Sequence, residues 1–148
     1  MSVGRILGLD IGDVVIGISV SDELGLTAQG LNTLKRKGIR SDFRYIKGLI
    51  DEYNICEVVV GLPKNMDGRL GPQAEKVIDF VERLRSEISL SVVTWDERLT
   101  TVAAENVLID ANISRKKRKG LADKIASQLI LQGYLDSKRY SCDSDSRQ

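Results

Sequence analysis

Carboxylates are the residues in this chain best placed to do chemistry, because its 148 residues include no histidine. A Ser-His-Asp triad, a Cys-His pair and a histidine-ligated metal are therefore excluded. Acids stand at three places: Asp10 ends an apolar run, Asp96 and Glu97 end another, and Asp123 falls in the first turn of an expected helix. A hydrolase without histidine must use such carboxylates to hold a metal ion or to move a proton.

Phosphodiester cleavage is the reaction that this set of acids suits. It places negative charge on the attacking and leaving oxygens, and two Mg²⁺ ions roughly 3.5 to 4 Å apart can stabilise both. Mg²⁺ takes oxygen ligands and keeps several waters, so a few carboxylates suffice. Neighbouring residues of a strand point to opposite faces, so only one of Asp96 and Glu97 is expected to be a direct ligand. Each acid alone is more often structural, since Asp is common in turns and at helix starts, but their joint occurrence favours a site.

The elements that must position these acids begin with three predicted antiparallel strands. Apolar runs over 5–10 and 14–20 flank a short glycine-containing turn, and a third run with alternating apolar positions spans 26–34. A basic cluster at 35–38 ends the third strand. Ser41 is the expected cap of a helix whose apolar face consists of Phe43, Ile46, Ile50 and Tyr53.

Strands and helices alternate in the rest of the chain. Residues 57–61, with Val58 to Val60 at their centre, predict a short buried strand, and residues 90–95 predict another. Between them Pro72 opens a helix with apolar residues every three or four positions, namely Ala74, Val77, Val81, Leu84 and Ile88. A helix capped by Thr100 or Thr101 is expected to reach about Ala111, and a last helix carries Leu121, Ile125 and Leu129.

This order of elements predicts an α/β fold of ribonuclease H-like architecture. Three antiparallel strands followed by alternating helices and strands imply a mixed five-stranded sheet flanked by helices. No repeat or linker divides the chain, so residues 1–136 are expected to form a single domain. Residues 137–148 are polar and are expected to form a C-terminal tail.

Several motifs resemble those of the YqgF family, also called RuvX. Residues 8–12 (Gly-Leu-Asp-Ile-Gly) and 16–22 look like its opening motif. Its later blocks agree with residues 60–63, 67–68 and 71, with residues 96–101, and with residues 123, 126, 130–132 and 134–135. The resemblance implies a fold similar to Holliday junction resolvases and a nuclease that matures the 5′ end of pre-16S ribosomal RNA. It also implies Asp10, Glu97 and Asp123 as the catalytic, metal-binding acids, with Mg²⁺ or Mn²⁺ as the metal, and so selects Glu97 over Asp96.

Positive charge is concentrated near the expected acids. Five consecutive cations, 115–119, precede the helix that carries Asp123, whereas the rest of residues 1–136 has a net charge of −5. The loop 61–71 leads into a helix N-terminus, where a phosphate can bind. Alone, a charge run is usually a solvated loop and such a loop is as often a surface turn. We expect nucleic acid to contact Lys64, Arg69, Arg98, Arg115, Lys116 and Lys117.

One position departs from the family's pattern. The family commonly has a basic residue just before the Ile16-Gly17 pair, whereas this chain has Asp13, Val14 and Val15. The phosphate contact of that residue is therefore expected to be absent or to come from elsewhere in the chain.

Other functions stay open alongside processing of the ribosomal RNA precursor. One is cleavage of branched DNA by a Holliday junction resolvase-like nuclease, and another is a non-catalytic ribosome-assembly factor that binds nucleic acid. The Asp-x-Gly turn at Asp10 also resembles the phosphate loop of actin-like and sugar-kinase-like ATPases, but those folds need a second lobe that 148 residues do not provide. A homodimer is left open.

Composition narrows the class of protein. A hydrophobic content of 42% with 29% charged residues is typical of a soluble globular protein, and 5% aromatic residues argue against base-stacking platforms. No apolar run approaches the roughly 20 residues that span a bilayer, so no membrane partner and a cytoplasmic location are expected. Cys56 and Cys142 are expected to be free thiols, and Trp95 is expected in the core.

Overall fold

The computed structural model describes residues 4–63, 70–96 and 125–138. The strands are β1 (Arg5–Ile11), β2 (Val15–Ser21), β3 (Ala28–Gly30), β4 (Leu34–Lys35), β5 (Ile55–Leu62) and β6 (Ser91–Asp96). The helices are α1 (Ile39–Tyr53), α2 (Pro72–Glu87) and a helical segment over residues 125–138. The predicted helix at 100–111 and the basic loop at 115–119 lie outside the described residues.

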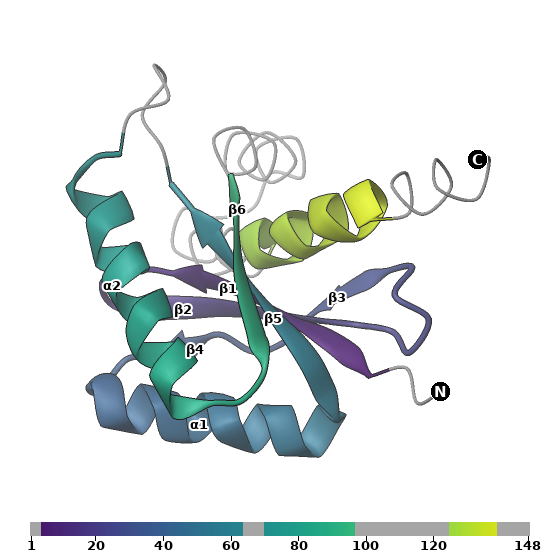
Figure 1. Ribbon diagram of the computed structural model, residues 1–148, viewed down its shortest axis with the longest axis horizontal. Coiled ribbons are helices and arrows are strands. Elements are labelled where there is room, and N and C mark those ends of the chain that lie inside the picture. The colour runs from purple at the N-terminus through teal and green to yellow at the C-terminus, as the bar shows by residue number, and fades with distance from the viewer. Residues whose placement is uncertain (1–3, 64–69, 97–124, 139–148) are drawn as a thin grey trace, which may run out of the picture.

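The strands form one mixed sheet in the order β3-β2-β1-β5-β6, with β4 pairing beside β3 on β2 (Figure 1). β1, β2 and β3 are antiparallel, whereas β1, β5 and β6 run parallel. The sheet therefore changes from antiparallel to parallel at β1, and the carboxyl ends of β1, β5 and β6 lie at one edge. The predicted mixed sheet is confirmed.

The third predicted strand is present as two short strands, β3 and β4. Ser19 pairs with Gly30 and Ile16 pairs with Leu34, so residues 31–33 stand opposite only Gly17 and Ile18. Three residues opposite two cannot continue the ladder of paired residues. The extra residue forms a bulge that separates β3 from β4. The NH of Leu31 still donates to the carbonyl of Ile18 at 2.8 Å, which keeps the bulged segment on the edge of β2.

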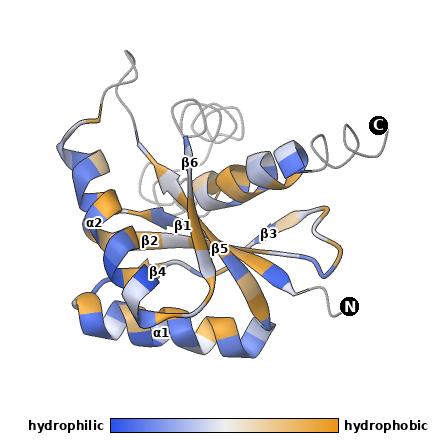
Figure 2. Cartoon of the chain, viewed as in Figure 1, coloured by the Kyte–Doolittle hydropathy of each residue, from blue (hydrophilic) through white to orange (hydrophobic). Residues whose placement is uncertain are grey.

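Helices cover both faces of the sheet (Figure 1). α1 and α2 pack on one face, over a core that includes Leu7, Leu9 and Val58. The helix over 125–138 covers the other face, where Ile130, Leu131 and Leu135 are buried with Val59. Figure 2 shows α1 and α2 banded with apolar and polar residues, as the periodicity of the sequence predicts. No helix in the described ranges is long and apolar enough to span a bilayer.

α1 begins three residues earlier than the sequence predicts. Its N-cap is Gly38, and the NH of Asp42 makes the first helical hydrogen bond, to the carbonyl of Gly38 at 2.9 Å. The prediction that Ser41 caps the helix is therefore wrong. The Asp42 side chain is fully buried and is paired with Arg36, and this tertiary contact outweighs the local capping preference of Ser41.

The helix over 125–138 approaches β1 very closely at Gly8. A Cβ atom added at Gly8 would lie 2.9 Å from the Leu131 Cβ and would also collide with the Ser19 hydroxyl. The Ser127 hydroxyl donates to the Gly8 carbonyl at 3.1 Å, and the Ser19 hydroxyl donates to the Ser127 carbonyl at 2.9 Å. Because Ser19 and Ser127 are fully buried, these hydrogen bonds both satisfy the hydroxyls and fix the helix at one position over the sheet.

Replacing Gly8 by alanine is expected to push this helix away from β1. The Leu131 Cβ is fixed to the helix backbone and the Ser19 hydroxyl is held by buried hydrogen bonds, so the added methyl should cost about 1–3 kcal/mol of unfolding free energy. Urea denaturation provides the measurement. Gly48→Ala is the matched control, because a methyl group added at Gly48 in α1 would meet open space, and alanine there should stabilise by about 0.5–1 kcal/mol. Equal stability of Gly8→Ala and the wild type would contradict the close approach.

Candidate functional site

Asp10 lies at the carboxyl end of β1, between the antiparallel β2 and the parallel β5. It stands opposite Gly17 on β2, and its neighbour Leu9 aligns with Val60 on β5. Leu9 packs in the core beneath α1 and α2. Since side chains alternate along a strand, Asp10 belongs to the opposite face, which Gly8 shares and which the helix over 125–138 covers. Asp10 is partly exposed there.

Asp96, at the carboxyl end of β6, belongs to the other face. In the parallel ladder Val60 aligns with Thr94, two residues before Asp96. Val92 is buried beneath α1 and α2, whereas Val93 and Trp95 pack with the helix over 125–138. The alternation therefore separates Asp96 from Asp10. Within the described ranges, no three acidic or cysteine side chains are grouped so that they could hold a metal ion.

The other predicted site residues lie outside the described residues, namely Glu97, Asp123, Lys64, Arg69, Arg98, Arg115, Lys116 and Lys117. The direction of the last helix is nevertheless defined. Ser127 contacts Gly8, whereas Lys138 pairs with Glu57, which aligns with Ile6 near the start of β1. The helix thus runs away from the edge where Asp10 lies, and its upstream end is the nearer one.

Cations from distant parts of the chain surround the turn that follows Asp10. The Arg36 guanidinium donates to the Gly12 carbonyl at 3.0 Å, and the Lys76 ammonium lies 3.3 Å from the Asp13 carboxylate. The Gln73 amide donates to the Ile11 carbonyl at 3.3 Å. α2 and the segment before α1 therefore bring positive charge to a turn that has none of its own.

Arg36 also connects this turn to both helices on the same face. Its Nε donates to the buried Asp42 carboxylate at 2.9 Å, and its guanidinium carbon lies 5.5 Å from the centre of the Phe80 ring. Sequence reasoning missed this role and treated Arg36 as part of a basic strand end. The only sequence signal was the combination of an arginine with an acid six residues later in a helix start, and many solvated pairs share it.

Trp95 and Tyr134 pack edge to face, with ring centres 5.9 Å apart. Trp95 is partly buried in the smaller core, which agrees with its expected packing role. The Tyr134 hydroxyl donates to the Glu57 carboxylate. Burial, followed by that hydrogen bond and the charge of Glu57, raises the pKa of the Tyr134 phenol well above its ordinary value. Cys56, on the same strand as Glu57, is a free and exposed thiol, as predicted.

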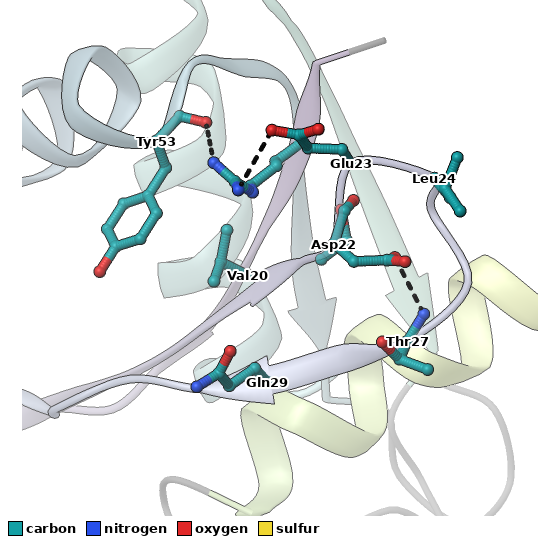
Figure 3. Close-up of a pocket in the computed structure, with 9 residues that line it drawn as sticks. Val20, Asp22, Glu23, Leu24, Thr27, Gln29 and Tyr53 are labelled. Atoms are coloured by element: carbon teal, nitrogen blue, oxygen red, sulfur yellow. Dashed lines mark hydrogen bonds and ion pairs between the residues drawn. The ribbon is translucent and has the colours of Figure 1, made fainter.

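A hollow of about 420 Å³ lies at the opposite edge of the sheet (Figure 3). Arg5 and Tyr53 line it, and the Arg5 guanidinium is 3.4 Å from the Glu23 carboxylate. The Asp22 carboxylate accepts hydrogen bonds from the NH groups of Thr27 and Leu26, at 3.1 and 2.7 Å, which lower its pKa. Arg5 and Asp10 are five residues apart on β1, or roughly 17 Å. The hollow is therefore separate from the edge with Asp10. The hydrogen bonds of Asp22 stabilise the turn between β2 and β3.

Comparison with known proteins gives the family. The family model described as RuvX, Holliday junction resolvase, matches residues 4–137. The chain belongs to this family. A relative from Halothermothrix orenii named "Putative pre-16S rRNA nuclease" is 57% identical over 132 residues, which cover 89% of this chain and 94% of the relative. The family resemblance noted from the motifs is thereby confirmed.

Solved structures similar to this RuvX-family chain share its fold. The fowlpox virus Holliday junction resolvase has a TM-score of 0.55 at 18% identity and covers 90% of this chain and 98% of its own. Thermus thermophilus RuvC in complex with a Holliday junction substrate has a TM-score of 0.52 at 18% identity, with 86% and 91% covered. The predicted ribonuclease H-like architecture is confirmed.

Removing the Arg36 side chain is expected to destabilise the protein strongly. Asp42 would keep a fully buried carboxylate without its cation, which costs about 3–5 kcal/mol in comparable pairs. Arg36→Ala should therefore lower the unfolding free energy in urea by that amount. Arg83→Ala removes the exposed partner of Asp79 on α2 and should change it by less than about 0.5 kcal/mol. Similar losses in the two variants would contradict a special role for Arg36.

Tyr134 is expected to make stability fall at alkaline pH. Its folded-state pKa is raised above the ordinary value of 10, so the folded state retains a proton that the unfolded chain releases. The contribution is complete below pH 10 and is lost as the pH rises further through the folded-state value. Tyr134→Phe should flatten the decline in unfolding free energy above pH 10, whereas Tyr45→Phe, at an exposed position on α1, should leave it unchanged. A decline of wild-type steepness in Tyr134→Phe would contradict this assignment.

Proposed function

We propose that this chain is a divalent-metal-dependent endonuclease that hydrolyses phosphodiester bonds in structured nucleic acid. Asp10 carries the proposal: it lies at the carboxyl end of the central strand, where β1 changes from antiparallel to parallel pairing, on the face covered by the last helix. The names of the relatives and the family description support nuclease activity.

Asp10, Glu97 and Asp123 are the proposed catalytic and metal-binding acids. The alternation along β6 supports Glu97 over Asp96, because Asp96 belongs to the face opposite Asp10. The direction of the last helix supports Asp123, because the upstream end of that helix is nearest the edge with Asp10.

Mg²⁺ or Mn²⁺ is the metal that these residues fit. The chain has no histidine and the three donors are all carboxylates, a set that suits hard cations. When bound, such an ion stabilises the charge that develops on the phosphate and acidifies a water molecule. Asp10 is proposed to hold the ion from β1, while Arg36 fixes the backbone just beyond it through the Gly12 carbonyl.

Phosphate contacts are proposed to come from several cations around this edge. They include the predicted set Lys64, Arg69, Arg98, Arg115, Lys116 and Lys117. Lys76 supports a further contact, since it lies beside the turn in which the family's usual basic residue is missing. Its exposed ammonium group can exchange the Asp13 carboxylate for a substrate phosphate at little cost.

Precursor 16S ribosomal RNA is the proposed substrate, because relatives that match nearly this whole chain are named for it. Branched DNA is the second candidate, favoured by the family description and by the resolvases that share the fold. Action on ribosomal RNA precursors would take place in the cytoplasm. A homodimer remains part of the hypothesis for the DNA substrate, since a four-way junction presents two equivalent strands.

Asp10→Asn is expected to abolish cleavage, with loss of at least about a hundredfold in rate, because it removes a charged ligand. The assay compares a ribosomal RNA precursor with a four-way DNA junction, each with Mg²⁺, with Mn²⁺ and with a chelator. Asp79→Asn, at an exposed position on α2, is the matched control and should cleave at the wild-type rate.

The neighbouring acids on β6 provide a second comparison. Glu97→Gln should lose activity as Asp10→Asn does, while Asp96→Asn should retain much more. Full cleavage by a folded Asp10→Asn variant would overturn the site. Binding of both nucleic acids without any metal-dependent product, by wild type as well, would favour the non-catalytic assembly factor.

A further inference from the structure

The described part of the chain segregates its charge. Residues 35–47 hold six of its eleven Lys and Arg residues but only one of its fourteen Asp and Glu residues. Outside this segment the described residues therefore carry a net charge of −8. A chain with a formal net charge of +1 has, in this one segment, a strongly positive surface.

Four of these six cations are exposed, namely Lys35, Lys37, Arg40 and Arg44. We refer to them as the α1 basic surface. The remaining two are engaged, Arg36 with Asp42 at 2.9 Å and Lys47 with Glu87 at 2.8 Å. The α1 basic surface forms no ion pair with any residue of the described ranges. Arg40 is attracted by the Glu87 carboxylate at longer range, but the four exposed cations remain accessible to an external anion.

The surface is hollowed where α1 faces the end of α2. Arg40, Phe43, Arg44, Lys47 and Glu87 line a depression of about 450 Å³. This volume accommodates a phosphate group with its water shell. Arg40 and Arg44 are one helical turn apart, roughly 6 Å along the axis. This separation is comparable with that of neighbouring phosphates along one strand, so the two guanidinium groups can each meet a different phosphate of the same strand.

The α1 basic surface begins close to the edge that carries Asp10. Lys35 pairs with Val15 on β2, and Asp10 stands opposite Gly17 of the same strand. Two strand spacings and two residues along the strand place Lys35 roughly 12 Å from Asp10. Lys37 follows, and α1 then carries Arg40 and Arg44 farther away. Gly38, the N-cap of α1, has no side chain that could cover the positive helix end between them.

We propose that the α1 basic surface binds the phosphate backbone of the nucleic-acid strand that extends from the cleavage site, a few nucleotides beyond it. Its location relative to the scissile bond rests on the proposed function. The partner is the repeating phosphate itself, so the contact is independent of base sequence and is shared by RNA and DNA. Arg40 and Arg44 add a second anchor on the face of α1 and α2, whereas Lys35, opposite Val15, belongs to the same face as Asp10.

The test compares two double variants of equal net charge. Arg40→Gln/Arg44→Gln removes two charges from the α1 basic surface, and Arg83→Gln/Lys138→Gln removes two exposed charges from α2 and the last helix. Fluorescence anisotropy measures binding of labelled RNA and DNA duplexes in the presence of chelator, across a salt series. Arg40→Gln/Arg44→Gln should bind about tenfold more weakly at low salt. The slope of its log affinity against log salt should become shallower by about 0.7–0.9 for each phosphate that is no longer neutralised. The second double variant should stay within about twofold of wild type.

Duplex length supplies the second readout. A duplex too short to reach from Asp10 to α1 should bind the wild type and Arg40→Gln/Arg44→Gln equally, whereas a duplex several turns longer should distinguish them. Lys35→Gln/Lys37→Gln should show the same pattern. Thermal unfolding verifies that each variant is folded.

Two results would overturn the proposal: equal weakening by both double variants, or a loss that is the same for short and long duplexes. Because binding is measured without cleavage, these results are independent of the proposed activity. If Asp10→Asn cleaves normally while the salt slopes behave as expected, the proposed catalytic acid fails and the basic surface stands. An effect confined to RNA, or to DNA, would instead contradict recognition of the backbone alone.

Discussion

The contact between Gly8 and the last helix is the constraint on which the arrangement of the site depends. β1 is buried on both faces and paired on both edges, so the helix that covers it can come close only where β1 has no side chain. Gly8 provides that place, and Ser127 and Ser19 fasten it through buried hydrogen bonds. Asp10 follows two residues later on the same face. One close contact thus sets the distance between β1, at the strand end with Asp10, and the helix over residues 125–138.

On the other face, a buried ion pair has the corresponding role. Arg36 contacts the turn after Asp10, the first turn of α1 and the Phe80 ring of α2, three segments that are distant in sequence. Burying a charged pair costs desolvation energy, and well-packed apolar residues could supply equal stability. An apolar side chain could not donate to the Gly12 carbonyl, however. Compared with apolar packing the pair adds little to overall stability, although removing Arg36 alone would leave Asp42 buried without its cation. Its particular role is to fix the geometry of the turn.

Features with local signals could be predicted from the sequence, and features set by tertiary contacts could not. Periodicity and β-branched runs predicted the strands, the helix at Pro72 and the last helix, because each buries one regular face. The predicted start of α1 was wrong because Asp42 is held by Arg36, a contact that no local pattern encodes. The bulge at residues 31–33 depends on the register of two pairings with β2, which the alternation of apolar residues does not specify. Asp10 was predictable because a strand end is a local feature, whereas Lys76 reaches the same turn only through the packing of α2.

Charge segregation explains how a nearly neutral chain can bind a polyanion. Its acids outnumber its cations over most of the described surface, and this excess repels phosphates from regions where binding would be unproductive. Cations are concentrated instead beside the turn after Asp10 and along the start of α1. The screening length at physiological salt is about 8–10 Å, somewhat less than the roughly 12 Å between Lys35 and Asp10. The α1 basic surface is therefore expected to act on a strand by direct contact with its phosphates, and these contacts should weaken as salt rises together with those expected near Asp10.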